Sequence, residues 1–142
     1  MAKTVLVVAN ETLGGRPLLA KIKELAAQQE IRVVVCVPRT NPRQGNIIYD
    51  EAVFDAAQVR IDLARKILRE EGIENAIGEV GDPDPFTAVM NAVQFFRVDD
   101  IVISTLPATR SGWLRADLIE RVRRASNKPV EHVVAESADA VA

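Results

Sequence analysis

Hydroxyl and guanidinium side chains follow an apolar run in the C-terminal half of the chain. Residues 101–103 are Ile-Val-Ile, and residues 104–113 read Ser-Thr-Leu-Pro-Ala-Thr-Arg-Ser-Gly-Trp. Hydroxyl groups beside a guanidinium are typical donors to a bound anion. The same residue types are also ordinary turn formers, so a plain surface loop is an equal interpretation. The segment therefore predicts either an anion site or a solvated turn.

The second half of this site is predicted at the end of another apolar run. Residues 5–9, Val-Leu-Val-Val-Ala, are apolar on both faces, which is typical of a central strand covered by helices on each side. In an open α/β sheet, ligands bind beyond the carboxyl ends of strands where the strand order reverses. The candidate ligand-binding residues, all expected at that place, are Asn10, Ser104, Thr105, Arg110 and Ser111.

The positions of these residues depend on an alternation of strands and helices along the chain. Strands are predicted at 5–9, 31–37, 76–80, 101–103 and 130–135, and helices at 17–29, 50–71, from residue 85 onward, and around residues 118–122. Such an alternation predicts a three-layer α/β/α sandwich with a five-stranded parallel sheet. The strand 76–80 is expected near an edge, because Gly78 and polar neighbours weaken it.

Local signals give the ends of several elements. Pro38 is expected to stop the second strand, and Gly72 to stop the long helix. Asp84 before Pro85 has the pattern of an N-cap followed by proline in the first helical turn. The helix that follows has a predicted apolar stripe of Phe86, Val89, Met90, Val93 and Phe96.

Length and composition exclude several classes of protein. The 142 residues match one domain, predicted at 1–136, with a frayed tail at 137–142. Eighteen basic against 20 acidic residues, without a basic block, argue against nucleic acid or membrane surfaces as partners. One cysteine, Cys36, and one histidine, His132, leave neither a disulfide nor a metal-binding cluster. No apolar run reaches membrane-spanning length, so we expect a cytoplasmic protein.

The chain resembles the universal stress proteins, a branch of the nucleotide-binding α/β superfamily. The resemblance lies in the opening VLVVAN, the Gly81-Asp82 step, and the ending from Glu120-Arg121-Val122 to Ser126-Asn127-Lys128-Pro129-Val130. It looks closest to an actinobacterial-type variant with the blocks VVANET, GEVGDPDP, VISTLP and SGWLR. The resemblance implies a Rossmann-like sheet with strand order 3-2-1-4-5.

ATP-binding members of that family carry the pattern G-x2-G-x9-G-[ST] after the fourth strand. In this chain Ser104 and Pro107 stand in the first two glycine positions, and the closing pair falls on Ala116-Asp117, with a loop about one residue short. Pro107 has no backbone N–H to offer a phosphate. Asp117 places a carboxylate at the positive end of the last helix, where a phosphate would lie. The glycine-rich ATP loop is therefore lacking, and we expect no cofactor, with ATP disfavoured by Pro107 and Asp117.

No catalytic or metal-binding residues are assigned. A serine nucleophile needs a base within reach, and His132 is expected on the fifth strand, away from the loop cluster. Cys36 is expected to be a small core residue rather than a reactive thiol. The leading interpretation is a non-catalytic binding or regulatory module with a degenerate nucleotide site. The alternative is a nucleotide-binding protein with weak ATP hydrolase activity that uses the loops after the first and fourth strands.

The last strand predicts a protein partner. Residues 130–135 contain Val130, Val133 and Val134 and no proline, so an edge strand there exposes apolar side chains and unpaired backbone groups. Pairing across a two-fold axis would cover it, and the resemblance implies the same homodimer. A tail or bulge that shields the edge is the competing interpretation. A third hypothesis is a structural dimer that presents the loop 39–46 to another protein.

Overall fold

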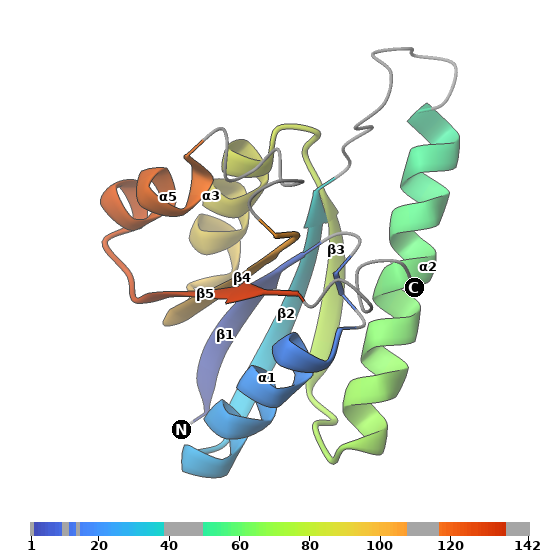
Figure 1. The fold of residues 1–142 in the computed structure, drawn as a ribbon, viewed down its shortest axis with the longest axis vertical. Helices are drawn as coiled ribbons and strands as arrows, with labels where there is room; N and C mark the ends of the chain where they lie inside the picture. Colours follow the sequence, from blue (N-terminus) through green and yellow to red (C-terminus); the bar gives the residue numbers. More distant parts are fainter. Residues whose placement is uncertain (1, 10–11, 14, 39–49, 108–116, 136–142) are drawn as a thin grey trace.

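The computed structural model describes residues 2–9, 12–13, 15–38, 50–107 and 117–135 (Figure 1). In chain order the elements are β1 (Lys3–Val8), α1 (Arg16–Gln28), β2 (Ile31–Pro38), α2 (Asp50–Glu70), β3 (Ala76–Gly81), α3 (Pro85–Phe96), β4 (Asp100–Thr105), α5 (Leu118–Ser126) and β5 (Val130–Val134). All strand pairs are parallel, and the sheet has the order β3-β2-β1-β4-β5. The predicted α/β/α sandwich, its strand order and the edge position of β3 are confirmed.

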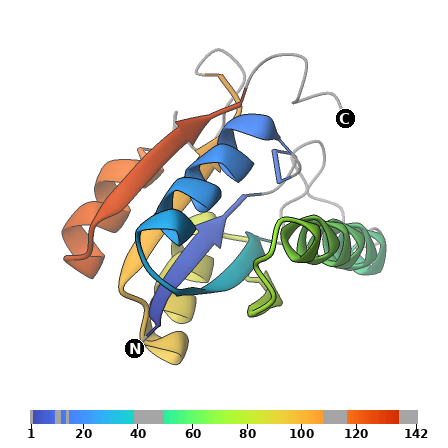
Figure 2. The same ribbon diagram turned by 90° about the horizontal axis from the view of Figure 1, so that it is seen from below.

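Helices cover both faces of the sheet. Figure 2 shows α1 and α2 on one side and α3 and α5 on the other. Alternate residues of β1 point to opposite faces: Val5 and Val7 pack with α1 and α2, whereas Leu6 and Val8 pack with α3 and α5. None of these four valine and leucine side chains is exposed, as expected for a central parallel strand.

The long helix α2 ends as its sequence predicts. Gly72 has a φ of +88°, a left-handed conformation that residues with a Cβ adopt only with strain, and its N–H donates to the Arg69 carbonyl at 3.0 Å. The stripe that faces the sheet is buried and consists of Ala57, Ile61, Ala64 and Leu68. Because β3 follows within a few residues of this stop, α2 lies directly alongside that strand (Figure 1).

Helix α3 begins as predicted, and its buried face includes two alanines beside the predicted stripe. The Asp84 carboxylate accepts from the Thr87 N–H at 3.2 Å, and Pro85 is the first helical residue. The fully buried residues of α3 are Ala88, Val89 and Ala92, whereas Phe86, Met90, Val93 and Phe96 are only half-buried. All residues of the predicted stripe except Met90 nevertheless belong to the core on this side of the sheet, with Phe86, Val93 and Phe96 packed against it, so the stripe is confirmed in large part. The prediction missed Ala88 and Ala92, which are buried more deeply than the aromatic residues. The reason is close packing: a Cβ on Gly81 would lie 2.8 Å from the Ala88 Cβ, so small side chains lie beneath the helix.

The second strand runs one residue further than expected. Pro38 is the last residue of β2 and is in register with Gly81, so the strand does end at this proline, although the proline itself belongs to it. The Ala9 N–H donates to the Cys36 carbonyl, which shows that even-numbered residues of β2 direct their backbone groups toward β1. Pro38 has no N–H to donate to the next acceptor on that side, the Ala9 carbonyl, so the ladder between β1 and β2 ends with the bond from Ala9.

Among the described residues, no helix combines the length and the apolar composition that crossing a membrane requires.

Candidate functional site

The reversal of strand order lies between β1 and β4. From β1 the chain adds β2 and β3 on one side, and it then returns to add β4 and β5 on the other. The carboxyl ends of β1 and β4 are neighbours, since Val8 is in register with Ile103. Ser104 and Thr105 therefore lie at the switch point, as predicted. The other predicted site residues, Asn10, Arg110 and Ser111, lie outside the described residues, as does Trp113.

Ser104 is bound to a second hydroxyl from the turn after β1. The Ser104 Oγ and the Thr12 Oγ1 are 2.7 Å apart, and each residue is only 2% exposed. Thr12 is fixed in a tight turn, because its carbonyl accepts from the Gly15 N–H at 3.0 Å just before α1 begins. This pair lies on the α1 and α2 face of the sheet, because Ser104 points to the same side as Val102.

Thr12 was missed by sequence reasoning, although a signal was present. It is a hydroxyl residue in the loop that follows one central strand, and Ser104 ends the neighbouring strand. Loops that follow adjacent parallel strands meet at one edge of the sheet, so two hydroxyls there are candidates for a mutual hydrogen bond.

Thr105 is bound to the only histidine of the chain. The Thr105 Oγ1 and the His132 Nε2 are 2.8 Å apart, and Thr105 is 2% exposed while His132 is half-buried. The expectation that His132 lies away from the Ser104 and Thr105 cluster was therefore wrong. The register explains the contact: His132 is opposite Ile103 across β4 and β5, and Thr105 points to the same face two residues further on.

Burial and a neighbouring guanidinium both favour the uncharged form of this imidazole. Burial lowers the pKa of His132, and the positive charge of Arg123 on α5 lowers it further. Arg123 is itself fixed by two contacts: its Nη1 pairs with the Glu120 Oε1 at 2.6 Å, and its Nη2 donates to the Val130 carbonyl at 3.2 Å. The imidazole that contacts the buried Thr105 hydroxyl is therefore harder to protonate than a free histidine side chain.

No family model matches this sequence, and no curated protein matches it. Solved structures do match. A universal stress protein family protein from Burkholderia pseudomallei is 18% identical, with a TM-score of 0.67, over 92% of this chain and 94% of that one. This chain has the universal stress protein fold. The resemblance predicted from the sequence is thereby confirmed for the fold.

Two further universal stress protein structures contain nucleotides. One, in complex with cAMP, is 14% identical with a TM-score of 0.65, over 94% of this chain and 98% of that one. The other, from Archaeoglobus fulgidus in complex with dAMP, is 18% identical with a TM-score of 0.63, over the same shares of the two chains. At such identities the comparison extends to the arrangement of elements and not to individual side chains.

In this universal stress protein fold, the geometry at Asp117, whose carboxylate was expected to exclude a phosphate, differs from the prediction. Asp117 directly precedes α5, as expected, and its backbone is left-handed with φ of 59°. Its carboxylate makes no capping hydrogen bond, so the expectation that this group occupies the positive end of the helix holds for its position only. Pro107, half-buried two residues after β4, presents no N–H.

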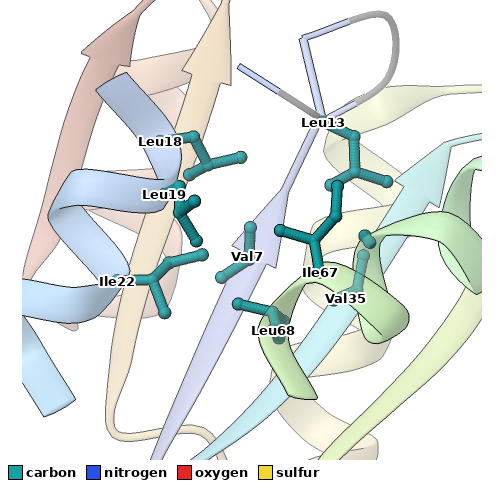
Figure 3. Close-up of a pocket in the computed structure, with 9 residues that line it drawn as sticks. Val7, Leu13, Leu18, Leu19, Ile22, Val35, Ile67 and Leu68 are labelled. Carbon is teal, nitrogen blue, oxygen red and sulfur yellow. The ribbon is translucent and has the colours of Figure 1, made fainter. Parts of the chain in front are cut away.

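A small apolar cavity lies elsewhere in the described part of this fold. It measures about 20 Å³ and is lined only by aliphatic side chains of β1, β2, α1 and α2 and by Leu13 (Figure 3). A cavity that could hold a water molecule needs polar partners for it, and none lines this one. The space between α1 and α2 is therefore a packing defect of the core and not a ligand site.

Other candidate groups are inert in their surroundings. Cys36 is free and fully buried, as predicted; burial, and secondly the charge of Glu79, raises the pKa of its thiol to about 12. Within the described ranges no three His, Cys, Asp or Glu side chains lie close enough together to hold a metal ion.

Proposed function

We propose that this chain is a non-catalytic binding or regulatory module of the universal stress protein type, with a degenerate nucleotide site. The observation that carries the proposal is the hydrogen bond between Ser104 and Thr12 at the switch point. The two hydroxyls at the carboxyl ends of β1 and β4 are buried and satisfy each other. A triphosphate bound here would have to break this bond, and Pro107 supplies no amide in return.

The contact between Thr105 and His132 does not make a hydrolase site. A nucleophilic hydroxyl must be reached by substrate, and Thr105 is almost fully buried. A general base works best with a pKa near the working pH, and the surroundings of His132 lower its pKa. These properties support a structural role for the pair.

The second candidate function is nucleotide binding. The nucleotide would be either a nucleoside monophosphate or ATP, and the protein would hydrolyse ATP weakly. The bound cAMP and dAMP of two similar structures favour it, because one phosphate needs fewer amide donors than three. Its contacts would be Asn10, Ser104, Thr105, Arg110 and Ser111.

We further propose that the protein is a homodimer through β5. This strand is one end of the sheet, and Val134 at its carboxyl end is 45% exposed. An uncovered edge strand with apolar side chains is a template for pairing with another strand.

Thermal unfolding with ATP and Mg²⁺, AMP or cAMP tests the nucleotide site. A ligand at about a hundred times its Kd stabilises a protein by about 2.7 kcal/mol, a shift of several degrees. We expect no magnesium-dependent shift with ATP and no phosphate release above the rate in buffer. Strong stabilisation by ATP at micromolar concentration would refute the degenerate site.

A matched variant separates the two candidates. Replacing both hydroxyl partners, Thr12→Val with Ser104→Ala, makes the buried pair apolar and removes its hydrogen-bond donors. If AMP stabilises the natural protein but not this variant, the monophosphate site is supported. Phosphate release that Arg110→Ala abolishes would support the hydrolase.

A further inference from the structure

An aromatic ring on α3 lies largely in solvent. Phe95 is 77% exposed, the highest value among the large apolar side chains of the described residues. Its ring is packed edge-on against Phe96, with the ring centroids 4.8 Å apart, and Phe96 packs against the core between α3 and the sheet. Aromatic side chains are enriched in protein interfaces, where they fill pockets of the partner. Phe95 is therefore a candidate anchor for a partner.

The strand β3 forms the other wall of a groove beside this ring. Ile77 is in register with Val34, and Glu79 with Cys36. Both of these β2 residues belong to the core on the α3 side, so Ile77 and Glu79 lie on that face of the sheet. Ile77 is itself exposed. The groove measures about 610 Å³, and the residues that line it are Glu79, Asn91, Gln94, Phe95 and Arg97.

The helix runs back along the strand, which gives the order of residues along the groove. Gly81 at the end of β3 lies beside Ala88, because a Cβ on this glycine would be 2.8 Å from the Ala88 Cβ. From there α3 returns the chain to the amino end of the sheet, where β4 begins. Glu79 and Asn91 therefore lie at one end of the groove and Arg97 at the other, about 9 Å further along the helix axis. The exposed ring lies between them.

The two charged side chains of the groove have opposite signs. Within the described residues neither Glu79 nor Arg97 forms a salt bridge. Burial raises the pKa of Glu79, because its carboxylate loses water without gaining a cation. An ammonium or guanidinium group at this end would stabilise the carboxylate, and a carboxylate would do the same for Arg97 at the other end. The groove thus presents a negative end, an apolar centre and a positive end.

We propose that this groove binds a short extended segment of another protein. A lysine or arginine of the segment contacts Glu79, an apolar side chain covers Phe95 and Ile77, and an aspartate or glutamate contacts Arg97. At about 3.3 Å per residue, the distance between the two ends places the basic and acidic residues about three positions apart. The proposal does not depend on the nucleotide site or on the dimer proposed above.

A second copy of this chain fits the groove less well than such a segment. A two-fold axis would bring the same groove opposite the first one. Two concave surfaces would then face each other, and the space between them would stay unfilled. An extended chain has the shape that fills a groove between a helix and a strand.

Selection from a displayed library of random peptides, with depletion against Phe95→Asp, supplies the probes for this groove. We expect the enriched peptides to carry a basic, an apolar and an acidic residue in the spacing given above, in either chain direction. Enriched peptides without a basic residue, or no enrichment over the depleted pool, would overturn the proposal.

Fluorescence polarisation with the best peptide tests the assigned contacts. Phe95→Ala should weaken binding by at least about thirtyfold and Glu79→Gln by about tenfold. The matched controls are Leu63→Ala, an exposed apolar residue of α2, and Glu74→Gln, an exposed carboxylate before β3. Both should bind within about twofold of the natural protein. Equal losses in the controls and the groove variants would refute the site.

Exchange of the two charges gives a second, independent test. The double variant Glu79→Arg with Arg97→Glu should prefer, by about tenfold, a peptide whose basic and acidic residues are exchanged. Identical preferences of the natural protein and the double variant would refute the assigned ends of the groove. Sedimentation velocity identifies the competing occupant: a dimer that Phe95→Ala dissociates would mean that a second copy fills the groove, and it would overturn the proposal.

Discussion

The two edge strands of the sheet, β3 and β5, are alike at their first residues and differ further along. At the start of β3 the Arg65 Nε of α2 donates to the Ala76 carbonyl at 3.0 Å, and at the start of β5 the Arg123 Nη2 of α5 donates to the Val130 carbonyl. Each is the first outward carbonyl of its strand, and each arginine comes from the preceding helix. A charged side chain on an edge carbonyl is one way in which proteins protect an edge strand.

The rest of the two strands is covered to different degrees. The long helix α2 runs along β3 so closely that a Cβ on Gly78 would lie 2.0 Å from the Ile61 Cγ2. The helix α5 is shorter, and Figures 1 and 2 show β5 extending along the outside of the sheet beyond it. The difference lies in how tightly a helix packs on each strand and not in exposure, because β3 has exposed residues at Ile77 and Gly78 just as β5 has at Glu131 and Val134.

Thiol labelling should reveal the largest difference between the edges. Cys36 is in register with Glu79 of β3, and its raised pKa leaves about a thousandfold less thiolate than the ordinary value of 9.0 at mild pH. We expect Cys36 to react at least about a thousandfold more slowly with a disulfide reagent in the native protein than in urea. In the background Cys36→Ser, the variant Val134→Cys on β5 should react at nearly the unfolded rate. Cys36 lies on β2, next to the edge strand β3, so native labelling within about tenfold of that rate would mean that the core beside β3 opens readily.

Packing changes should separate the edges next. Gly78→Val forces a side chain against Ile61, and such overpacking costs about 1–3 kcal/mol of unfolding free energy. Val134→Thr at the exposed end of β5 should change the same quantity by less than about 0.5 kcal/mol. Urea unfolding measures both, and Ile77→Val, exposed on the other face of β3, is the control. Equal costs at Gly78 and Val134 would contradict the tight packing of α2 on β3.

Acidification should produce the smallest effects, of opposite sign at the two edges. Burial raises the pKa of Glu79 on β3, so the folded state binds its proton more readily and loses stability as the pH rises through this pKa. His132 on β5 has a lowered pKa, so its contribution is complete above 6.5 and is lost as the pH falls through the folded value.

Single variants in the monomeric background Val134→Lys measure these two contributions. Glu79→Gln should be more stable than its parent at neutral pH, and the difference should disappear below the ordinary value of 4.5. His132→Gln should flatten the loss of stability below pH 6.5. Unfolding curves with the same pH dependence in both variants would show that neither group contributes to the difference between the edges.

The order of elements was predictable because it depends on local patterns. Apolar runs of strand length such as 5–9, turn residues such as Gly72, and the cap at Asp84 each act within a few residues. Right-handed crossovers and layered packing then leave few arrangements for five strands and four helices. The strand 76–80 was predicted near an edge from a local pattern too, because it contains Gly78 and polar neighbours.

The contacts of the site were not predictable in this way. Ser104 and Thr105 were placed correctly at the end of a strand, but their partners Thr12 and His132 lie 92 and 27 residues away in the sequence. Which face each hydroxyl points to, and what lies across from it, depends on the register of neighbouring strands. The same holds for α3, where the buried alanines follow from the close approach at Gly81.

The sequence by itself determined the alternation of strands and helices and the burial of the central strand, since each follows from residue types at short spacing. Only the tertiary structure decided that the two hydroxyls at the switch point are bound to partners on opposite faces of the sheet. It also decided how closely α2 packs on the edge strand β3. Register and helix packing bring together residues that are far apart in the chain, and a local sequence pattern carries no information about such contacts.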